Sequence, residues 1–275
     1  MSIQQGDLRS AAQIIADADA VIVAAGAGMG VDSGLPDFRG TEGFWRAYPA
    51  LSKTGLRFEE VASPATFQSD PRLAWGFYGH RLMLYRRTLP HAGFDILKKW
   101  MARAHRPGIV FTSNVDGHFQ AAGFDPRVVH ECHGSIHRLQ CTECATPPWS
   151  AHSLFPEIDE EQCRWVGPLP QCPSCGAMAR PNLLMFWDGD WVSTPYDEQE
   201  EHVQQLLSEM KRPVCIELGA GTAIASVRSF TQGVVATHGG KLVRINVREQ
   251  ATDARLGIGI AMGALRALKG IDELL

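Results

Sequence analysis

The chain has 275 residues, 45% of them hydrophobic and 20% charged, which is typical of a globular protein with a full buried core. Its formal net charge is −4 and no basic block occurs, so the electrostatic footprint of a nucleic-acid partner is missing. No apolar run approaches the roughly 20 residues of a membrane helix, and the polar stretch Met1–Ser10 lacks a signal-peptide core, so we expect no membrane association.

Short apolar runs alternate with helix-length segments along most of the chain. Apolar residues in Asp7–Asp19 recur at helical spacing, and the run Ala20–Ala25 that follows suits a buried strand. We predict further strands in four more runs: Gly108–Thr112, Val128–Val129, Val214–Leu218 and Leu242–Val247. The alternation predicts an α/β fold, a doubly wound parallel sheet with helices on both faces. The loops after the strands should converge on one crevice beyond their carboxyl ends.

Two segments interrupt this alternation. Residues 40–90 are helical in pattern and rich in aromatic side chains, whereas residues 139–180 contain cysteines and prolines with little periodicity. We therefore expect a discontinuous Rossmann-like domain made of residues 1–39, 91–138 and 181–275. The helical insert and the cysteine module should together form a small second domain.

The cysteine module contains two Cys-x-x-Cys pairs, Cys141 with Cys144 and Cys172 with Cys175, separated by 27 residues. Seven cysteines are an odd number for a disulfide framework, and this spacing is typical of a zinc ribbon. Four thiolates satisfy tetrahedral zinc and leave no site for water, so we predict a structural zinc ion. Redox pairs and disulfides are the alternatives. We expect the remaining cysteines not to bind the metal: Cys132, Cys163 and Cys215. Metal-binding thiols also indicate a reducing compartment, and hence a cytoplasmic protein.

A glycine-rich loop, Gly26–Gly30, follows the first predicted strand. Glycines there let the backbone approach a pyrophosphate, and the N–H groups that follow favour an anion. The spacing is G-x-G-x-G and no acidic residue ends a second strand about 20 residues later, so an ordinary Rossmann dehydrogenase fits poorly. A tight turn without a ligand is the alternative. The next motif favours a dinucleotide, because Arg39 suits a phosphate, Phe38 can cover a ring and Asp37 can fix the loop.

A polar segment also follows the strand that ends at Thr112. Asn114 and Asp116 offer an amide and a carboxylate to a carboxamide or a ribose. Nearby, His133 precedes a glycine between two short apolar runs, where an imidazole that titrates near neutrality suits a general base. A structural histidine is the alternative, because His130 and His137 lie close in sequence.

These residues together resemble the sirtuin family over nearly the whole chain. The motifs occur in the family's order: Gly26-Ala27-Gly28, Gly34-Leu-Pro-Asp-Phe-Arg39, Asn114-Val-Asp116, His133-Gly134, the two cysteine pairs, Gly221-Thr222 and Ile245-Asn246. The resemblance implies a Rossmann-like NAD-binding domain, with the helical insert and a structural zinc module in a small domain. It also implies NAD-dependent removal of an acyl group from protein lysine, which yields nicotinamide and O-acyl-ADP-ribose.

The resemblance further implies roles for individual residues. His133 would be the base that acts on a ribose hydroxyl, and Asn114 and Asp116 would hold the nicotinamide end of NAD. The implied contacts to the rest of NAD are these: Ser113 in the nicotinamide-ribose pocket; Phe38 and Arg39 over the reacting ribose; Gly26, Ala27 and Gly28 at the pyrophosphate; and Gly221, Thr222 and Asn246 on the adenosine side. Asp37 and Gly219 complete the expected cofactor-binding set.

The sequence departs from the family pattern at four places. Ser113 stands where glutamine is usual, and Gly30 and Ala223 each replace a serine. The family's substrate-binding Phe-Gly-Glu segment reads Phe186-Trp187-Asp188, so Trp187 adds bulk where a backbone strand normally pairs with the substrate peptide. NAD use is therefore better supported by the sequence than peptide deacylation.

Tyr78 and Arg81 resemble the Tyr-x-x-Arg motif of the sirtuin branch that prefers acidic acyl groups. At i and i+3 on a helix they share a face, so Arg81 could clamp a succinyl or malonyl carboxylate. The alternative is an arginine on a solvated face that also carries Arg86 and Arg87.

Three functions therefore stay open. The first is a deacylase acting on acyl-lysine proteins or peptides. The second, favoured by the altered Phe186-Trp187-Asp188 segment, is an NAD-dependent ADP-ribosyltransferase or NAD hydrolase. The third is a binding module that senses NAD or ADP-ribose without turnover. The sequence does not determine the oligomeric state.

Overall fold

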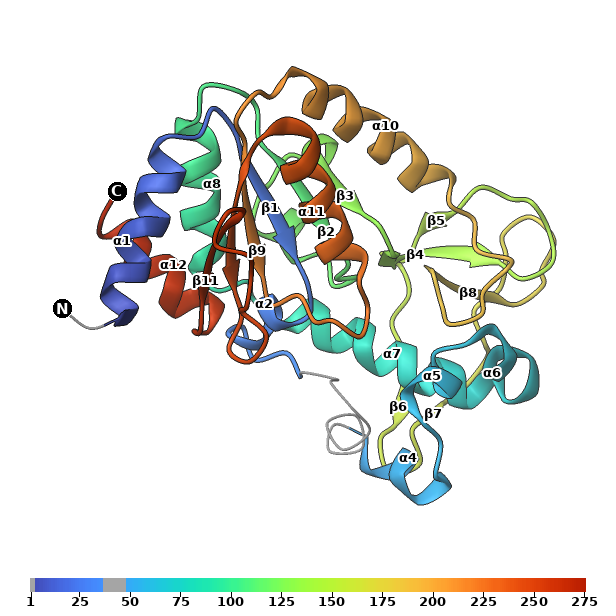
Figure 1. Ribbon diagram of the computed structural model, residues 1–275. Helices are drawn as coiled ribbons and strands as arrows, with labels where there is room; N and C mark the ends of the chain where they lie inside the picture. The colour runs from blue at the N-terminus through green and yellow to red at the C-terminus, as the bar shows by residue number, and fades with distance from the viewer. Residues whose placement is uncertain (1–2, 37–47) are drawn as a thin grey trace.

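The computed structural model describes residues 3–36 and 48–275, and its centre is a six-stranded parallel sheet (Figure 1). The strands are β1 (Val21–Ala25), β2 (Ile109–Thr112), β3 (Val129–Glu131), β9 (Val214–Leu218), β10 (Lys241–Ile245) and β11 (Gly257–Ile260), in the order β11-β10-β9-β1-β2-β3. Five of them confirm the predicted runs. The sixth, β11, was not predicted because its sequence, Gly-Ile-Gly-Ile, breaks the apolar pattern with two glycines.

Helices cover both faces of this sheet, as expected for a doubly wound fold (Figure 1). One face packs against α1 (Ile3–Ala16), α8 (Gly93–Arg103) and α12 (Ala264–Asp272), and the other against α10 (Thr194–Glu209) and α11 (Ser226–His238). Because successive side chains of a strand point to opposite faces, Val21 and Val23 enter the first core and Ile22 enters the second. All five residues of β1 are buried, which explains their continuous apolar run.

The strand order reverses between β1 and β9. From β1 the chain continues outward through β2 and β3 on one side, and then returns to build β9, β10 and β11 on the other. Such a switch point leaves a crevice at the carboxyl ends of the two central strands, because the loops that follow them run in opposite directions. The short helix α2 (Gly28–Val31) starts directly at this edge.

The two predicted inserts form a second lobe with its own core (Figure 1). The helices of this lobe are α4 (Pro49–Thr54), α5 (Phe58–Val61), α6 (Pro64–Ser69) and α7 (Pro71–Arg87). Its strands are β4 (Gly134–Cys141), β5 (Trp149–Ser150) and β8 (Ala179–Leu183), which form an antiparallel sheet in the order β5-β4-β8, and the pair β6 (Ile158–Asp159) and β7 (Arg164–Trp165).

Aromatic packing joins the helical insert to the cysteine module. Trp75 of α7 lies 5.4 Å from Trp165 of β7 between ring centroids, and its indole N–H donates to the Ala179 carbonyl at 2.9 Å. Strands β4 and β8 extend to Gly134 and Leu183, beyond the predicted module at 139–180, because their antiparallel ladder continues toward the large lobe. Within the described ranges, no helix is both long and apolar enough to span a bilayer.

Candidate active site and metal centre

The loops that follow β1, β2, β9 and β10 converge at the switch point, which confirms the expected crevice edge. The Gly28 N–H donates to the Gly219 carbonyl at 3.1 Å, and the Asn114 side-chain amide donates to the Gly26 carbonyl at 3.0 Å. On the other side, the Asn246 amide donates to the Ala220 carbonyl at 2.8 Å. These three bonds tie the predicted pyrophosphate, nicotinamide and adenosine segments into one rigid rim.

Glycine is required where the first and third of these loops meet. Gly219 has a φ of +61°, and a Cβ placed there would run into the backbone of Gly28. A Cβ on Gly26 would lie 2.8 Å from the Ala220 Cα. The bare backbones therefore touch, and the Gly26 and Gly28 N–H groups donate to the Leu218 and Gly219 carbonyls at 2.9 and 3.1 Å.

Gly219→Ala is expected to lower the free energy of unfolding by about 2–4 kcal/mol, because it adds a backbone collision to the left-handed strain. Gly239→Ala is the matched control, since Gly239 also has a positive φ, +63°, but nothing lies within 4 Å of its would-be Cβ. It should cost only about 1 kcal/mol. Urea unfolding measures both, and equal losses in the two variants would contradict a packing role for Gly219.

The predicted nicotinamide segment is fixed by its own hydrogen bonds. The Ser113 N–H donates to the Ala25 carbonyl and the Asn114 N–H to Thr112 Oγ1, each at 3.0 Å. Asp116 is buried, and its Oδ1 accepts from the His118 N–H at 2.9 Å. The Asp116 side chain is therefore held by the backbone of the turn that follows it, in the segment where the sequence predicts a polar pocket.

His133 lies in the turn between β3 and β4, and its Nε2 is 3.0 Å from the Ser226 Oγ at the start of α11. Burial lowers the pKa of His133, and the backbone of Ser113 opposes this only in part. The imidazole is therefore neutral at pH 7, the form that a general base needs. Sequence reasoning missed Ser226, because this residue is 93 positions away and no local pattern marks it.

On the predicted adenosine side, an acidic residue that sequence reasoning missed organises the loops. The Glu249 carboxylate accepts from the Thr222 N–H at 3.0 Å and from the Thr222 hydroxyl at 2.9 Å. A Cβ on Gly221 would lie 3.5 Å from the same carboxylate. Asn246 is 2% exposed, and its Oδ1 accepts from the Glu249 N–H at 3.0 Å. The buried Asn246 side chain therefore holds the loop that follows β10 in place. Asp37, Phe38 and Arg39 lie outside the described residues.

The Phe186-Trp187-Asp188 segment follows β8. Just before it, the Leu184 N–H donates to the His133 carbonyl at 3.0 Å, which places the start of this loop beside the histidine. Trp187 has a φ of +57° and is 74% exposed, so a bulky residue occupies a left-handed position that favours glycine. This conformation explains why glycine is usual there. The indole extends into solvent and does not fill the lobe's core.

The residues on either side of Trp187 hold it in place. The Phe186 ring packs edge-on against Phe58 of α5 at 5.8 Å, and its N–H donates to the Ala62 carbonyl at 3.0 Å. Asp188 forms a buried bidentate ion pair with Arg180, with bonds of 2.7 and 2.9 Å. The Asp188 carboxylate is thus turned inward, and any substrate contact at this position has to use its backbone.

Tyr78 and Arg81 are both buried in α7, at 2% and 8% exposure, so the alternative of a solvated arginine face is wrong for Arg81. The Arg81 guanidinium donates to the Tyr85 hydroxyl at 3.0 and 2.6 Å and lies over the rings of Phe77, Tyr78 and Tyr85. Burial raises the pKa of Tyr85, and the Arg81 charge opposes this. Arg81 is therefore held inside the helical insert by its aromatic neighbours.

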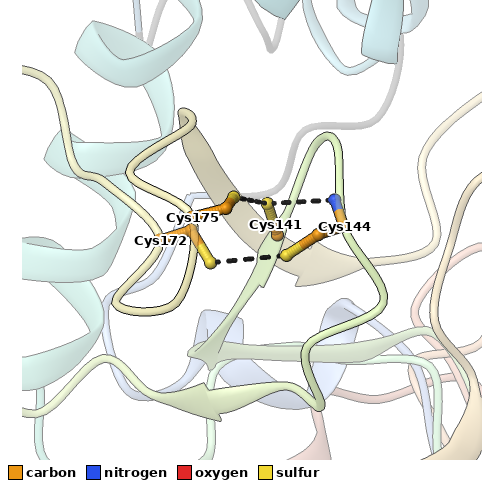
Figure 2. A group of neighbouring side chains, drawn as sticks. All are labelled: Cys141, Cys144, Cys172 and Cys175. Carbon is orange, nitrogen blue, oxygen red and sulfur yellow. Dashed lines mark hydrogen bonds between the residues drawn. The ribbon is translucent and has the colours of Figure 1, made fainter.

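The four predicted metal ligands form one cluster at the tip of the small sheet (Figure 2). Their sulfur atoms all lie within 4.8 Å of one another, with 3.5 Å between Cys141 and Cys175 and 3.7 Å between Cys144 and Cys172. Zn–S bonds of about 2.3 Å in a tetrahedron require sulfur separations of roughly 3.8 Å. The N–H groups of Glu143 and Cys144 each donate to the Cys141 sulfur at 3.3 Å, as in the turns that hold metal-binding cysteine pairs. The donor set fits structural zinc.

The reversed strand order, the convergent loops and the sulfur cluster define a Rossmann-like α/β protein with a metal-binding module. A model described as the Sir2 family matches residues 26–216. The chain is 30% identical to an NAD-dependent protein deacylase of Thermococcus kodakarensis over 87% of this chain and 84% of that protein. It is also 30% identical to one of Pyrococcus furiosus, over 89% and 88%. The chain belongs to the Sir2 family.

Solved structures agree on the fold. A Sir2 homologue in complex with NAD superposes with a TM-score of 0.73 at 22% identity, over 96% of this chain and 92% of that one. A second Sir2 enzyme superposes with a TM-score of 0.72 at 24% identity, over 98% of both chains. The family therefore accounts for both lobes, the Rossmann-like sheet and the inserted module.

Proposed function

We propose that this protein removes acyl groups from lysine side chains of proteins and consumes NAD in doing so. The observation that carries the proposal is the placement of His133: a half-buried imidazole with a lowered pKa, where the large-lobe rim meets the 184–187 segment. The relatives from Thermococcus and Pyrococcus are named NAD-dependent protein deacylases, which supports the same reaction.

Each part of the rim has a role in this reaction. NAD supplies the ribose carbon that accepts the acyl oxygen, together with nicotinamide as the leaving group. In this proposal the Gly26–Gly28 turn lies against the pyrophosphate, and Asn114 and Asp116 orient the nicotinamide end. His133 takes a proton from a ribose hydroxyl, and Ser226 orients its ring. The zinc ion is structural, because four protein thiolates fill its coordination sphere.

The decisive experiment measures nicotinamide release with and without acyl-lysine peptides. Release that requires the peptide, with deacylated lysine as a product, supports the deacylase. Peptide-independent release supports the second candidate, an ADP-ribosyltransferase or NAD hydrolase, which the exposed Trp187 in the peptide-binding segment favours. Binding of NAD without nicotinamide release would support the third candidate, a module that binds NAD without turnover.

A preference for acidic acyl groups is part of the proposal. Arg81 lies on the same helix face as Tyr78 and is buried among aromatic rings, so a carboxylate on the acyl chain that reached it would meet a guanidinium in low-dielectric surroundings.

Arg81→Met should therefore lower kcat/KM for succinyl- and malonyl-lysine peptides by roughly 10-fold to 100-fold relative to acetyl-lysine. Arg87→Met, on the exposed side of the same helix, is the control and should leave the ratio unchanged. Competition between the three peptides measures the ratio directly. If wild type uses all three equally, the preference is refuted while the deacylase activity stands.

A further inference from the structure

The hydroxyl group of Thr146 lies beside the sulfur cluster and has no part in the proposed reaction. Its Oγ1 is 3.1 Å from the Cys144 sulfur and 3.9 Å from the Cys172 sulfur. These two sulfurs are 3.7 Å apart and belong to different Cys-x-x-Cys pairs (Figure 2). Thr146 therefore lies where the two halves of the metal centre meet.

Two kinds of hydrogen bond reach the sulfurs of the first cysteine pair. The Cys141 sulfur accepts from the backbone N–H groups of Glu143 and Cys144, which belong to the turn that closes the pair. The Cys144 sulfur contacts a side chain from outside that turn, the Thr146 hydroxyl. Only the second kind depends on residue type, because every residue except proline supplies a backbone N–H. A substitution at Thr146 can therefore remove one bond to the cluster and leave the turn intact.

Zinc binding sets the direction of the bond between Thr146 and Cys144. Cysteine binds a metal as a thiolate, which has no proton and can only accept a hydrogen bond. A threonine hydroxyl has a single proton to donate, and the Cys144 sulfur is nearer to it than the Cys172 sulfur, at 3.1 Å against 3.9 Å. The hydroxyl therefore donates to Cys144. Hydrogen bonds to a charged acceptor are about twice as strong as those between neutral groups.

The local sequence holds the Thr146 hydroxyl in this position. Pro147 follows Thr146, and a proline restricts the residue before it to extended backbone. The β-branched side chain of threonine also has few accessible rotamers. Shortly afterwards the chain enters β5 at Trp149, which pairs with Leu139 of β4. The loop after Cys144 is thus attached to the sheet at one end and to the sulfur cluster at the other.

We propose that Thr146 is a positioning residue of the metal centre, whose hydroxyl donates to the Cys144 thiolate and strengthens zinc binding. Four thiolates around one zinc ion carry more negative charge than the ion offsets. A donated hydrogen bond disperses part of this excess and holds the Cys144 sulfur in place beside Cys172. Without the hydroxyl, Cys144 should be the first ligand to leave the metal.

Thr146→Val tests the inference, because valine keeps the shape of threonine and removes the hydroxyl. In competition with a chelator, the full-length variant should bind zinc roughly 10-fold more weakly than wild type, as expected when a partner of a metal ligand is lost. Thr146→Ser keeps a hydroxyl and should restore the wild-type affinity. Thr142→Val is the matched control, since the Thr142 hydroxyl donates to the Met178 carbonyl at 2.9 Å in the same module. It should bind zinc with close to wild-type affinity.

Cobalt(II) in place of zinc gives a readout that a loss of stability alone would not move. A hydrogen bond to a thiolate lowers the energy of the sulfur electrons. Its removal in Thr146→Val should therefore shift the sulfur-to-cobalt charge-transfer absorption to longer wavelength, and the band should stay in place in Thr146→Ser and Thr142→Val.

Two results would overturn the inference: equal zinc affinities for Thr146→Val and Thr142→Val, or an unshifted cobalt band in Thr146→Val. Both measurements proceed without NAD or peptide. They therefore decide the role of Thr146 whichever reaction the protein performs.

Discussion

His133→Ala should reduce deacylation by roughly 100-fold to 10,000-fold, the range expected when a general base is removed. In the proposed reaction the histidine acts after nicotinamide has left, so the loss should fall on formation of deacylated lysine. Nicotinamide release should decrease much less. Measuring both products in single-turnover reactions places the defect, and calorimetry should show that NAD still binds.

The same experiment has a structural control and a clear contrary outcome. His133 loses one hydrogen bond, to Ser226, so the variant should be destabilised by only about 1 kcal/mol. Ser226→Ala removes that partner but keeps the base, and should cost much less activity than His133→Ala. If His133→Ala abolished nicotinamide release and deacylation equally, the histidine would have to act earlier, or the site would have collapsed.

Removal of the metal should have the largest effect on stability. Structural zinc contributes about 10–16 kcal/mol of apparent binding free energy in small zinc modules at pH 7, so chelation or Cys172→Ser should unfold the β4-β5-β8 region. Activity should disappear as well, because His133 precedes β4 and Leu184 follows β8 at the end of this sheet that faces the large lobe.

Cys163→Ser is the matched control for metal binding. Cys163 lies in the same module and is buried, but its sulfur is not part of the cluster. Elemental analysis should find one zinc per chain in this variant and a large loss in Cys172→Ser. Full activity in a chelated protein shown to be free of metal would contradict a structural role for the ion.

Much of the large lobe was predictable, because a strand buried on both faces must be apolar at every position. β1 and β9 illustrate this, since every residue of both is buried. Strand β11 was not predicted, and the reason is also physical. Side chains at Gly257 and Gly259 would collide with the backbones of Leu242 and Gln250, so close packing requires glycine where the pattern needs apolar residues.

The residues of the candidate site also fall into two groups, those that local sequence predicts and those that it does not. Residues within a few positions of each other were found from local spacing; the structure brings the two cysteine pairs together, and the nicotinamide roles of Asn114 and Asp116 stay predictions. Contacts made across the fold were not found. Ser226 meets His133, and Glu249 meets Thr222, only because the switch point brings separate loops to one edge.

Local sequence also could not predict the structure of the altered Phe186-Trp187-Asp188 segment. From its motif alone Asp188 could have faced a substrate, whereas the antiparallel pairing of β4 and β8 buries it against Arg180. The left-handed backbone at Trp187 is likewise a property of the folded turn. Neither feature can be recognised from the hydrophobic periodicity of the sequence.

The bond between His133 and Leu184 has a consequence for how the base is placed. The chain enters the small sheet at His133 and leaves it at Leu184, and the backbone bond holds these two crossings side by side. The helical insert joins the large lobe separately, through the segment between α7 and α8. His133 thus shares its backbone anchor with the segment that carries Trp187, so the imidazole and that segment are fixed relative to one another.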